Sequence, residues 1–186
     1  MRRKRLTGIA ATVLALAVAV PAPLRAELAV GAQAPDFTVQ GALGGKPFTV
    51  RLGEALKRGP VVLYFYPKAF THGCTLEAHA FAEASDDFRR AGATVIGMSN
   101  DDLATLRRFS TEACRDKFAV ASATPAMVRA YDVALSGEAA PTAPTKRTSY
   151  VIGRDGRIAF VHSDLDYRDH VRLTLEAVRR LANKPG

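Results

Sequence analysis

The segment Pro60–Pro67, PVVLYFYP, constrains the fold more than any other part of the chain. Every residue between its two prolines is β-branched, aromatic or leucine. A continuous run of this kind indicates a strand that is buried on both faces. Apolar residues at helical spacing follow from Leu76 to Phe88, and Gly92 is the expected stop. A strand buried in this way needs a layer of other elements on each side, so a layered fold around a sheet is expected.

The same alternation of strand and helix continues along the chain. Further strands are expected in 30–52, around the turn Gly44-Gly45, and in 93–99, 118–122 and 148–162, the last range being a hairpin that turns at Asp155-Gly156. Further helices are expected in 100–118, capped by Asn100 or Asp101, in 124–133 and in 167–183. The stretch 134–147, rich in Ala, Pro and Thr, is expected to form an exposed loop. This order predicts an α/β sandwich with a mixed central sheet flanked by helices.

The first 26 residues have the layout of a secretory signal peptide. A basic start, MRRKR, precedes the apolar run Leu6–Val20, and the segment ends at the small residue Ala26. The run is short for a transmembrane helix, and an uncleaved anchor is the alternative. Cleavage is expected after Ala26, with Ala22 as the alternative. The mature protein is then a single domain, 27–186, exported to the bacterial periplasm without stable membrane association.

Removal of this segment changes the charge of the chain. Five of the 26 Lys and Arg lie in residues 1–26 and none of the 18 Asp and Glu does, which leaves a mature net charge of +3. The mature chain has no long basic run with interleaved aromatics, so no nucleic-acid partner is expected. Two cysteines in an exported protein indicate one structural disulfide or a working thiol pair.

Cys74 lies where the first buried strand gives way to a helix. With Thr71 as the helix N-cap, Cys74 falls in the first turn, where free N–H groups and the helix dipole favour an anion such as a thiolate. The Thr71 hydroxyl can point back toward the sulfur. Pro67 makes the strand exit rigid, and Gly73 leaves room beside the sulfur. The alternative is that Cys74 is a small buried hydrophobic residue.

Two other classes of protein are considered on these residues. A thiol–disulfide exchange protein normally carries Cys-x-x-Cys, but Thr75, Leu76 and Glu77 follow Cys74. A metal carrier could use His72, Cys74, Glu77 and His79. On a helix, however, residues 74 and 79 differ by about 140° in direction, so they do not share a face. No cofactor or metal is expected.

The segment YFYPKAFTHGCTLEAHAF resembles the active-site segment of the peroxiredoxins, with the signature Pro-x-x-x-Thr/Ser-x-x-Cys met by Pro67, Thr71 and Cys74. The resemblance is to the Q-type subgroup, also called the bacterioferritin-comigratory-protein group. GAQAPDFTV and RTSYVIGRDGRIAFVH resemble two further motifs of the family, in the same order. The resemblance covers most of residues 31–180.

This resemblance implies a thioredoxin-like fold and thiol-dependent reduction of hydrogen peroxide or organic hydroperoxides. It implies that Cys74 is the peroxidatic cysteine, that Thr71 holds the peroxide and that Pro67 shapes and shields the pocket. It places Arg147 beside the thiolate, where a permanent positive charge would stabilise the charge that develops on the peroxide oxygens. It further implies a monomer or weak dimer that depends on an external dithiol protein as reductant.

Two positions depart from the subgroup pattern, and they bear on the second cysteine. His72 stands where proline is common, and His79 stands where some members carry a second cysteine. Cys114 is the remaining candidate to resolve Cys74 by an intramolecular disulfide, a role that some Q-type proteins give to a similarly placed cysteine. A disulfide needs Cα atoms within about 7 Å, so local unwinding is expected to be required. The alternative is that Cys114 is a bystander.

Overall fold

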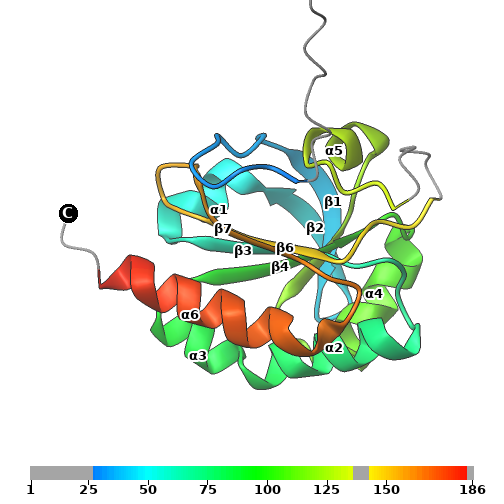
Figure 1. Cartoon of the computed structure of the whole chain (residues 1–186). Coiled ribbons are helices and arrows are strands. Elements are labelled where there is room, and N and C mark those ends of the chain that lie inside the picture. Colours follow the sequence, from blue (N-terminus) through cyan, green and yellow to red (C-terminus); the bar gives the residue numbers. More distant parts are fainter. Residues whose placement is uncertain (1–26, 136–142, 184–186) are drawn as a thin grey trace, which may run out of the picture.

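A mixed sheet of seven strands forms the centre of the structure, a computed structural model that describes residues 27–135 and 143–183. The strand order is β2-β1-β5-β4-β3-β6-β7 (Figure 1). The strands are β1 (Thr38–Leu43), β2 (Lys46–Arg51), β3 (Val61–Phe65), β4 (Thr94–Ser99), β5 (Ala119–Ser122), β6 (Thr148–Ile152) and β7 (Ile158–Ser163). The helices are α1 (Leu52–Arg58), α2 (His72–Glu83), α3 (Ser85–Arg90), α4 (Leu103–Glu112), α5 (Pro125–Ala130), the 3-10 helix η1 (Tyr167–Asp169) and α6 (His170–Ala182).

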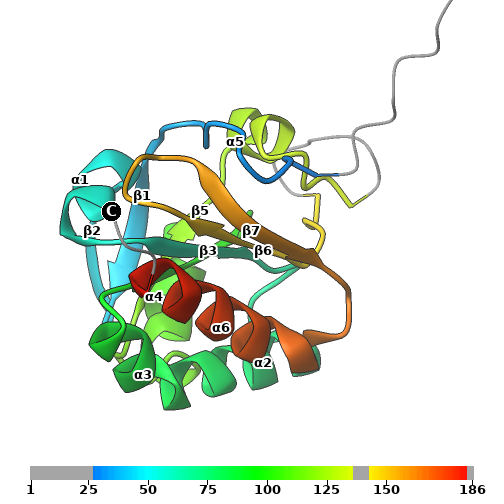
Figure 2. The same cartoon turned by 60° about the vertical axis from the view of Figure 1, so that its left-hand side comes forward.

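β3 lies inside the sheet and is buried over its whole length, as its sequence predicts. It pairs with β4 in parallel and with β6 in antiparallel orientation. Its side chains alternate between two apolar layers. Helices α2, α3, α4 and α6 cover one face of the sheet, and α1 and α5 cover the other (Figures 1 and 2). Val62 and Tyr64 belong to the first apolar layer, whereas Val61, Leu63 and Phe65 belong to the second. The predicted α/β sandwich with a mixed sheet is therefore confirmed.

The sequence predictions fail in detail at several helices. The single helix expected from Cys74 toward Gly92 is broken at Ala84 into α2 and α3, and α1 was not predicted. Neither Asn100 nor Asp101 caps α4, because the side chain of Asp102 accepts the hydrogen bond from the backbone N–H of Thr105 at 2.7 Å. The predicted signal peptide, 1–26, and residues 136–142 of the predicted loop lie outside the described residues.

Strand register brings distant parts of the chain together at one side of the sheet, where β3 and β7 end and β6 begins. Phe65, the last residue of β3, pairs with Thr148 at the start of β6. Thr148 in turn pairs with Ser163 at the end of β7. The segment before α2, the residue before β6 and the segment after β7 therefore meet at this side.

Candidate active site

The loop between β3 and α2 places Cys74 in the first turn of a helix, as predicted. Thr71 is the N-cap residue of α2, and the backbone N–H of Thr75 donates to its carbonyl at 2.9 Å. The Thr71 hydroxyl donates to the Lys68 carbonyl at 3.0 Å and makes no capping hydrogen bond to the helix. Pro67 is half-buried and Thr71 is exposed, while the Cys74 side chain is buried. The Cys74 thiol therefore lies just under the surface, in the first turn of a helix, where an anion is favoured.

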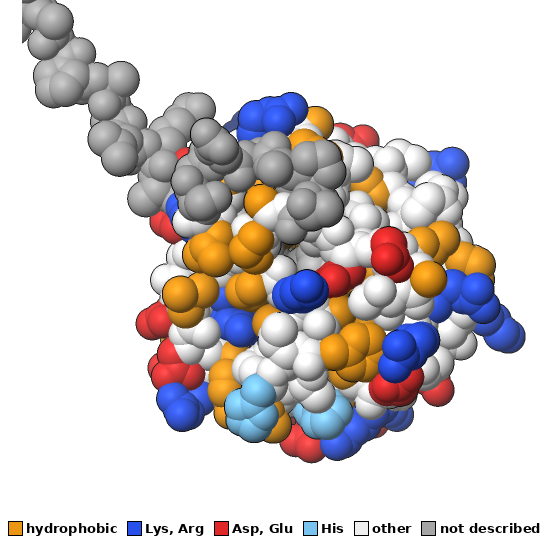
Figure 3. Space-filling model, turned by 90° about the vertical axis from the view of Figure 1, so that its right-hand side faces the viewer, with side chains coloured by type: hydrophobic (Ala, Val, Ile, Leu, Met, Phe, Trp, Pro, Cys, Tyr) orange, Lys and Arg blue, Asp and Glu red, His pale blue; other side chains and the backbone are white. Residues whose placement is uncertain are grey.

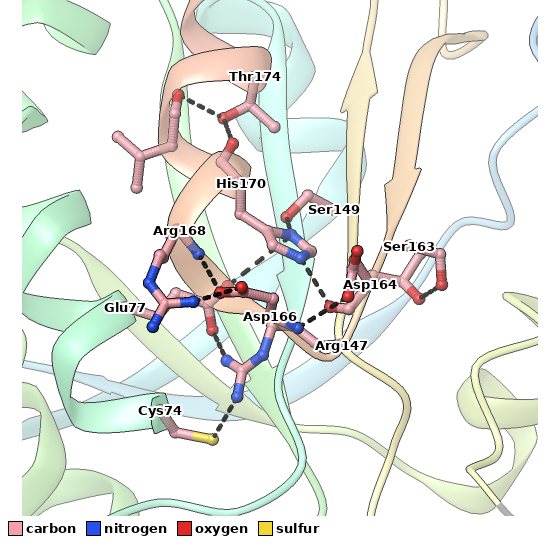
Figure 4. Close-up of polar contacts among 12 residues, drawn as sticks. Cys74, Glu77, Arg147, Ser149, Ser163, Asp164, Asp166, Arg168, His170 and Thr174 are labelled. Atoms are coloured by element: carbon pink, nitrogen blue, oxygen red, sulfur yellow. Dashed lines mark hydrogen bonds and ion pairs between the residues drawn. The ribbon is translucent and has the colours of Figure 1, made fainter. Parts of the chain in front are cut away.

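The strand register described above brings Arg147 to Cys74. Its Nη2 lies 3.4 Å from the Cys74 Sγ (Figure 4). Its Nε donates to the Leu165 carbonyl at 2.9 Å, and its Nη1 donates to the carboxylate of Glu77. Each nitrogen of the guanidinium group therefore has a different partner, which fixes the orientation of its plane. Gly73 permits this approach, because a Cβ added there would lie 3.3 Å from Arg147 Nη2.

Glu77 is a site residue that sequence reasoning considered only as a possible metal ligand. It lies three residues after Cys74 on α2, which puts both side chains on one face of the helix. Its side chain is fully buried and forms an ion pair with Arg147. Burial raises the pKa of Glu77 to about 8, against the lowering effect of Arg147. The pKa of Arg147 is raised in turn, since Glu77 and Cys74 outweigh the opposing effect of burial.

His170 is fully buried behind this pair. Its Nδ1 lies 2.8 Å from the Ser149 Oγ and 3.8 Å from Glu77 Oε1, and its Nε2 lies 2.9 Å from the Asp164 carbonyl (Figure 4). Burial lowers the pKa of His170 to about 4, with a smaller contribution from the neighbouring His162. The ring is therefore neutral at physiological pH.

Cys114 lies in the turn that follows α4. Its side chain is completely buried in the same apolar layer as Cys74. Both thiols are free. Burial raises the pKa of the Cys114 thiol, and Asp116 raises it further. In this conformation Cys114 is a protonated thiol that solvent does not reach.

The rest of the described chain offers limited further chemistry. Within residues 27–135 and 143–183, no three His, Cys, Asp or Glu side chains come together as metal ligands would. Among the same residues, no helix is both long and apolar enough to cross a bilayer. On the face seen in Figure 3, the described Lys and Arg side chains are interspersed with acidic and apolar ones. That face therefore shows a mixed surface rather than a continuous basic one.

Comparison with known proteins places these features in a family context. Residues 30–161 match the model of the AhpC/TSA family. The chain is 32% identical to chloroplastic peroxiredoxin Q of Triticum aestivum, over 94% of this chain and 81% of that protein. It is 27% identical to peroxiredoxin Bcp of Bacillus subtilis, over 83% of this chain and 98% of that protein. The solved structure of peroxidoxin BcpB from Mycobacterium tuberculosis superposes with a TM-score of 0.72 at 30% identity, covering 82% of this chain and 97% of that one.

Proposed function

This chain belongs to the AhpC/TSA family and is a peroxiredoxin, a thiol-dependent peroxidase of thioredoxin-like fold, and from that premise we propose that Cys74 is its peroxidatic cysteine. The observation that carries the proposal is the contact of 3.4 Å between Arg147 Nη2 and the Cys74 Sγ. A guanidinium group stays charged at any physiological pH, so it stabilises a thiolate at this position. For the second cysteine, buried after α4, burial and Asp116 both raise the thiol pKa, which disfavours a thiolate there.

In the proposed first step the Cys74 thiolate attacks one oxygen of the peroxide. The S–O bond forms as the O–O bond breaks, which yields a sulfenic acid and a hydroxide or alkoxide that takes up a proton. Arg147 stabilises the negative charge as it moves from sulfur to the leaving oxygen. Thr71 is proposed to bind the peroxide through its exposed hydroxyl, and Pro67 to shape the entrance.

Cys114 is proposed to resolve the sulfenic acid. Its thiol would condense with the sulfenic acid, releasing water and forming a Cys74–Cys114 disulfide that an external dithiol protein reduces. Both cysteines are buried, so the segments that carry them are proposed to unwind first. Phe70, Arg115 and Asp116 support such unwinding, since all three have positive φ angles, 63°, 50° and 58°. For residues other than glycine this conformation costs roughly 1–2 kcal/mol, which unwinding would release.

The function is tested by the fate of the two thiols. The reduced protein receives one equivalent of hydrogen peroxide, is quenched with an alkylating reagent, and is analysed by intact mass and peptide mapping. We expect rapid loss of both thiols and a linked Cys74–Cys114 peptide. In a Cys114→Ser variant we expect Cys74 to form a sulfenic acid at an unchanged rate, without the disulfide. Two thiols that react no faster than an ordinary cysteine would overturn the peroxidase assignment. Full turnover of Cys114→Ser with a dithiol reductant would remove the resolving role.

Residues 1–26 are proposed to direct export and to be removed. Their basic start, fifteen-residue apolar run and terminal Ala26 support a signal peptide. The reductant would then have to be a dithiol protein of the same exported compartment. When the full-length chain is expressed in a bacterium, the periplasmic fraction is expected to contain a protein that begins at Glu27, as read by N-terminal sequencing. Recovery of the chain with Met1 in the cytoplasmic fraction would contradict export.

A further inference from the structure

His170 is a buried titratable side chain for which the proposed reaction has no direct use. It is the first residue of α6, and its ring is enclosed by β6, α2 and the segment that follows β7. A buried imidazole with hydrogen bonds on both nitrogens is fixed in position and in tautomer. The question is what that fixed ring holds in place.

The tautomer follows from the two partners. The Asp164 carbonyl can only accept, so Nε2 carries the proton and donates to it at 2.9 Å. In a neutral ring Nδ1 is then the acceptor, and the Ser149 hydroxyl donates to it at 2.8 Å. His170 thereby ties the backbone of Asp164 to β6 through Ser149.

The segment that His170 holds is the one that orients Arg147. The backbone N–H of Asp164 donates to the Arg147 carbonyl at 3.2 Å. The next carbonyl, that of Leu165, accepts from Arg147 Nε at 2.9 Å. Leu165 itself is 60% exposed, so its side chain does little to hold this segment in place. The position of the Leu165 carbonyl therefore depends on the hydrogen bonds that the Asp164 backbone makes.

We propose that His170 is a positioning residue for the reaction of Cys74. By its hydrogen bond to the Asp164 carbonyl it fixes the position of the neighbouring Leu165 carbonyl. That carbonyl in turn orients the Arg147 guanidinium toward the Cys74 sulfur. The inference rests on the function proposed above for Cys74 and Arg147. A guanidinium group that loses the hydrogen bond of its Nε can rotate about the terminal bonds of the arginine side chain. Small misplacements of a catalytic group lower reaction rates strongly. His170 touches no reacting atom and acts through Asp164, Leu165 and Arg147.

The test uses substitutions that separate the two ring nitrogens. Glutamine at this position can place its amide nitrogen near Nε2 and keep the bond to Asp164, whereas asparagine reaches no further than Nδ1, and phenylalanine fills the space without either bond. The measured quantity is the second-order rate constant for oxidation of Cys74 by hydrogen peroxide. We expect His170→Gln to stay within about threefold of wild type, and His170→Asn and His170→Phe to be about 10- to 100-fold slower. His162→Asn, which alters the adjacent ring 4.5 Å away, is the matched control with an unchanged rate.

A second readout follows Arg147 itself. In ¹⁵N NMR spectra the Arg147 Nε–H signal is expected to exchange slowly in wild type and His170→Gln, and to be lost to exchange in His170→Asn. A role in stability alone would lower the rates of the Gln and Asn variants in parallel with their melting temperatures, and would overturn the proposal. So would wild-type rates in the Asn and Phe variants.

Should the Asn and Phe variants fail to fold, Ser149→Ala decides, because it removes the hydroxyl that orients the ring with little loss of volume. A rate more than about threefold below wild type supports the inference, and a rate within about threefold of wild type overturns it. Failure of the proposed function looks different: wild type itself would then lack a fast reaction with peroxide, while the NMR signal of Arg147 would still depend on His170.

Discussion

Replacing Arg147 by Lys is expected to lower the rate constant for oxidation of Cys74 by hydrogen peroxide about 100-fold, and replacing it by Met about 1000-fold. The three guanidinium nitrogens serve three different partners: the Cys74 Sγ, the Glu77 carboxylate and the Leu165 carbonyl. A lysine ammonium is a single point charge without this planar fork. It can approach Glu77 or Cys74, but it cannot hold both while it is anchored to Leu165.

The Arg147 variants are expected to remain folded. Without a neighbouring cation the buried Glu77 carboxyl can take up a proton, since burial already raises its pKa to about 8. The loss of rate can therefore be read as the loss of a correctly placed positive charge at the sulfur, once thermal unfolding shows that each variant is folded. Competition kinetics against a reference peroxidase gives the rate constants.

The matched control is Arg172→Lys. Arg172 also pairs with carboxylates, those of Asp169 and Glu176, but it is exposed on α6. Its replacement is expected to leave the rate unchanged. If Arg147→Lys oxidised within about threefold of wild type, the contact with the sulfur would not be the source of Cys74 reactivity.

The parts of this molecule that local sequence determines are the parts that could be predicted. β3 follows from its run of β-branched and aromatic residues, and the β6–β7 hairpin from the turn at Asp155-Gly156, where Gly156 has a positive φ of 78°. Cys74 falls in the first turn of α2 because a strand ends just before it and helical spacing begins. The break between α2 and α3 has no such local signal, since Ala84 favours a helix wherever packing permits one.

The parts that could not be predicted depend on contacts between distant residues. Glu77 is a charged residue within a helical pattern, a position that is usually exposed, and its burial depends on the cation that β6 brings to it. That meeting requires the register of β3, β6 and β7, which no local pattern specifies. Cys114 stands among charged neighbours in the sequence, yet the turn after α4 folds it inward through the positive φ angles of Arg115 and Asp116.

Replacing Glu77 by Ala is expected to lower the free energy of unfolding by about 2–3 kcal/mol, because it removes the buried hydrogen-bond partner of a charged group. The substitution leaves the Arg147 guanidinium, 5% exposed, without the carboxylate that pairs with it in the protein interior. Glu77→Gln keeps the shape and a hydrogen-bonding carbonyl, so it is expected to lose much less. Urea unfolding measures both variants. Glu83→Gln, at an exposed position on the same helix, is the control with little change.

The same variants give a pH dependence whose sign follows from the raised pKa of Glu77. Its folded-state value of about 8 lies above the ordinary value of 4.5, so between these values the folded protein binds this proton more tightly than the unfolded chain does. Wild type should therefore lose stability relative to Glu77→Gln as the pH rises through this window. A stability difference that stayed constant from about pH 5 to about pH 8 would mean that Glu77 is ionised throughout. Arg147 would then divide its charge between two anions, whereas a protonated Glu77 leaves that charge to the Cys74 thiolate.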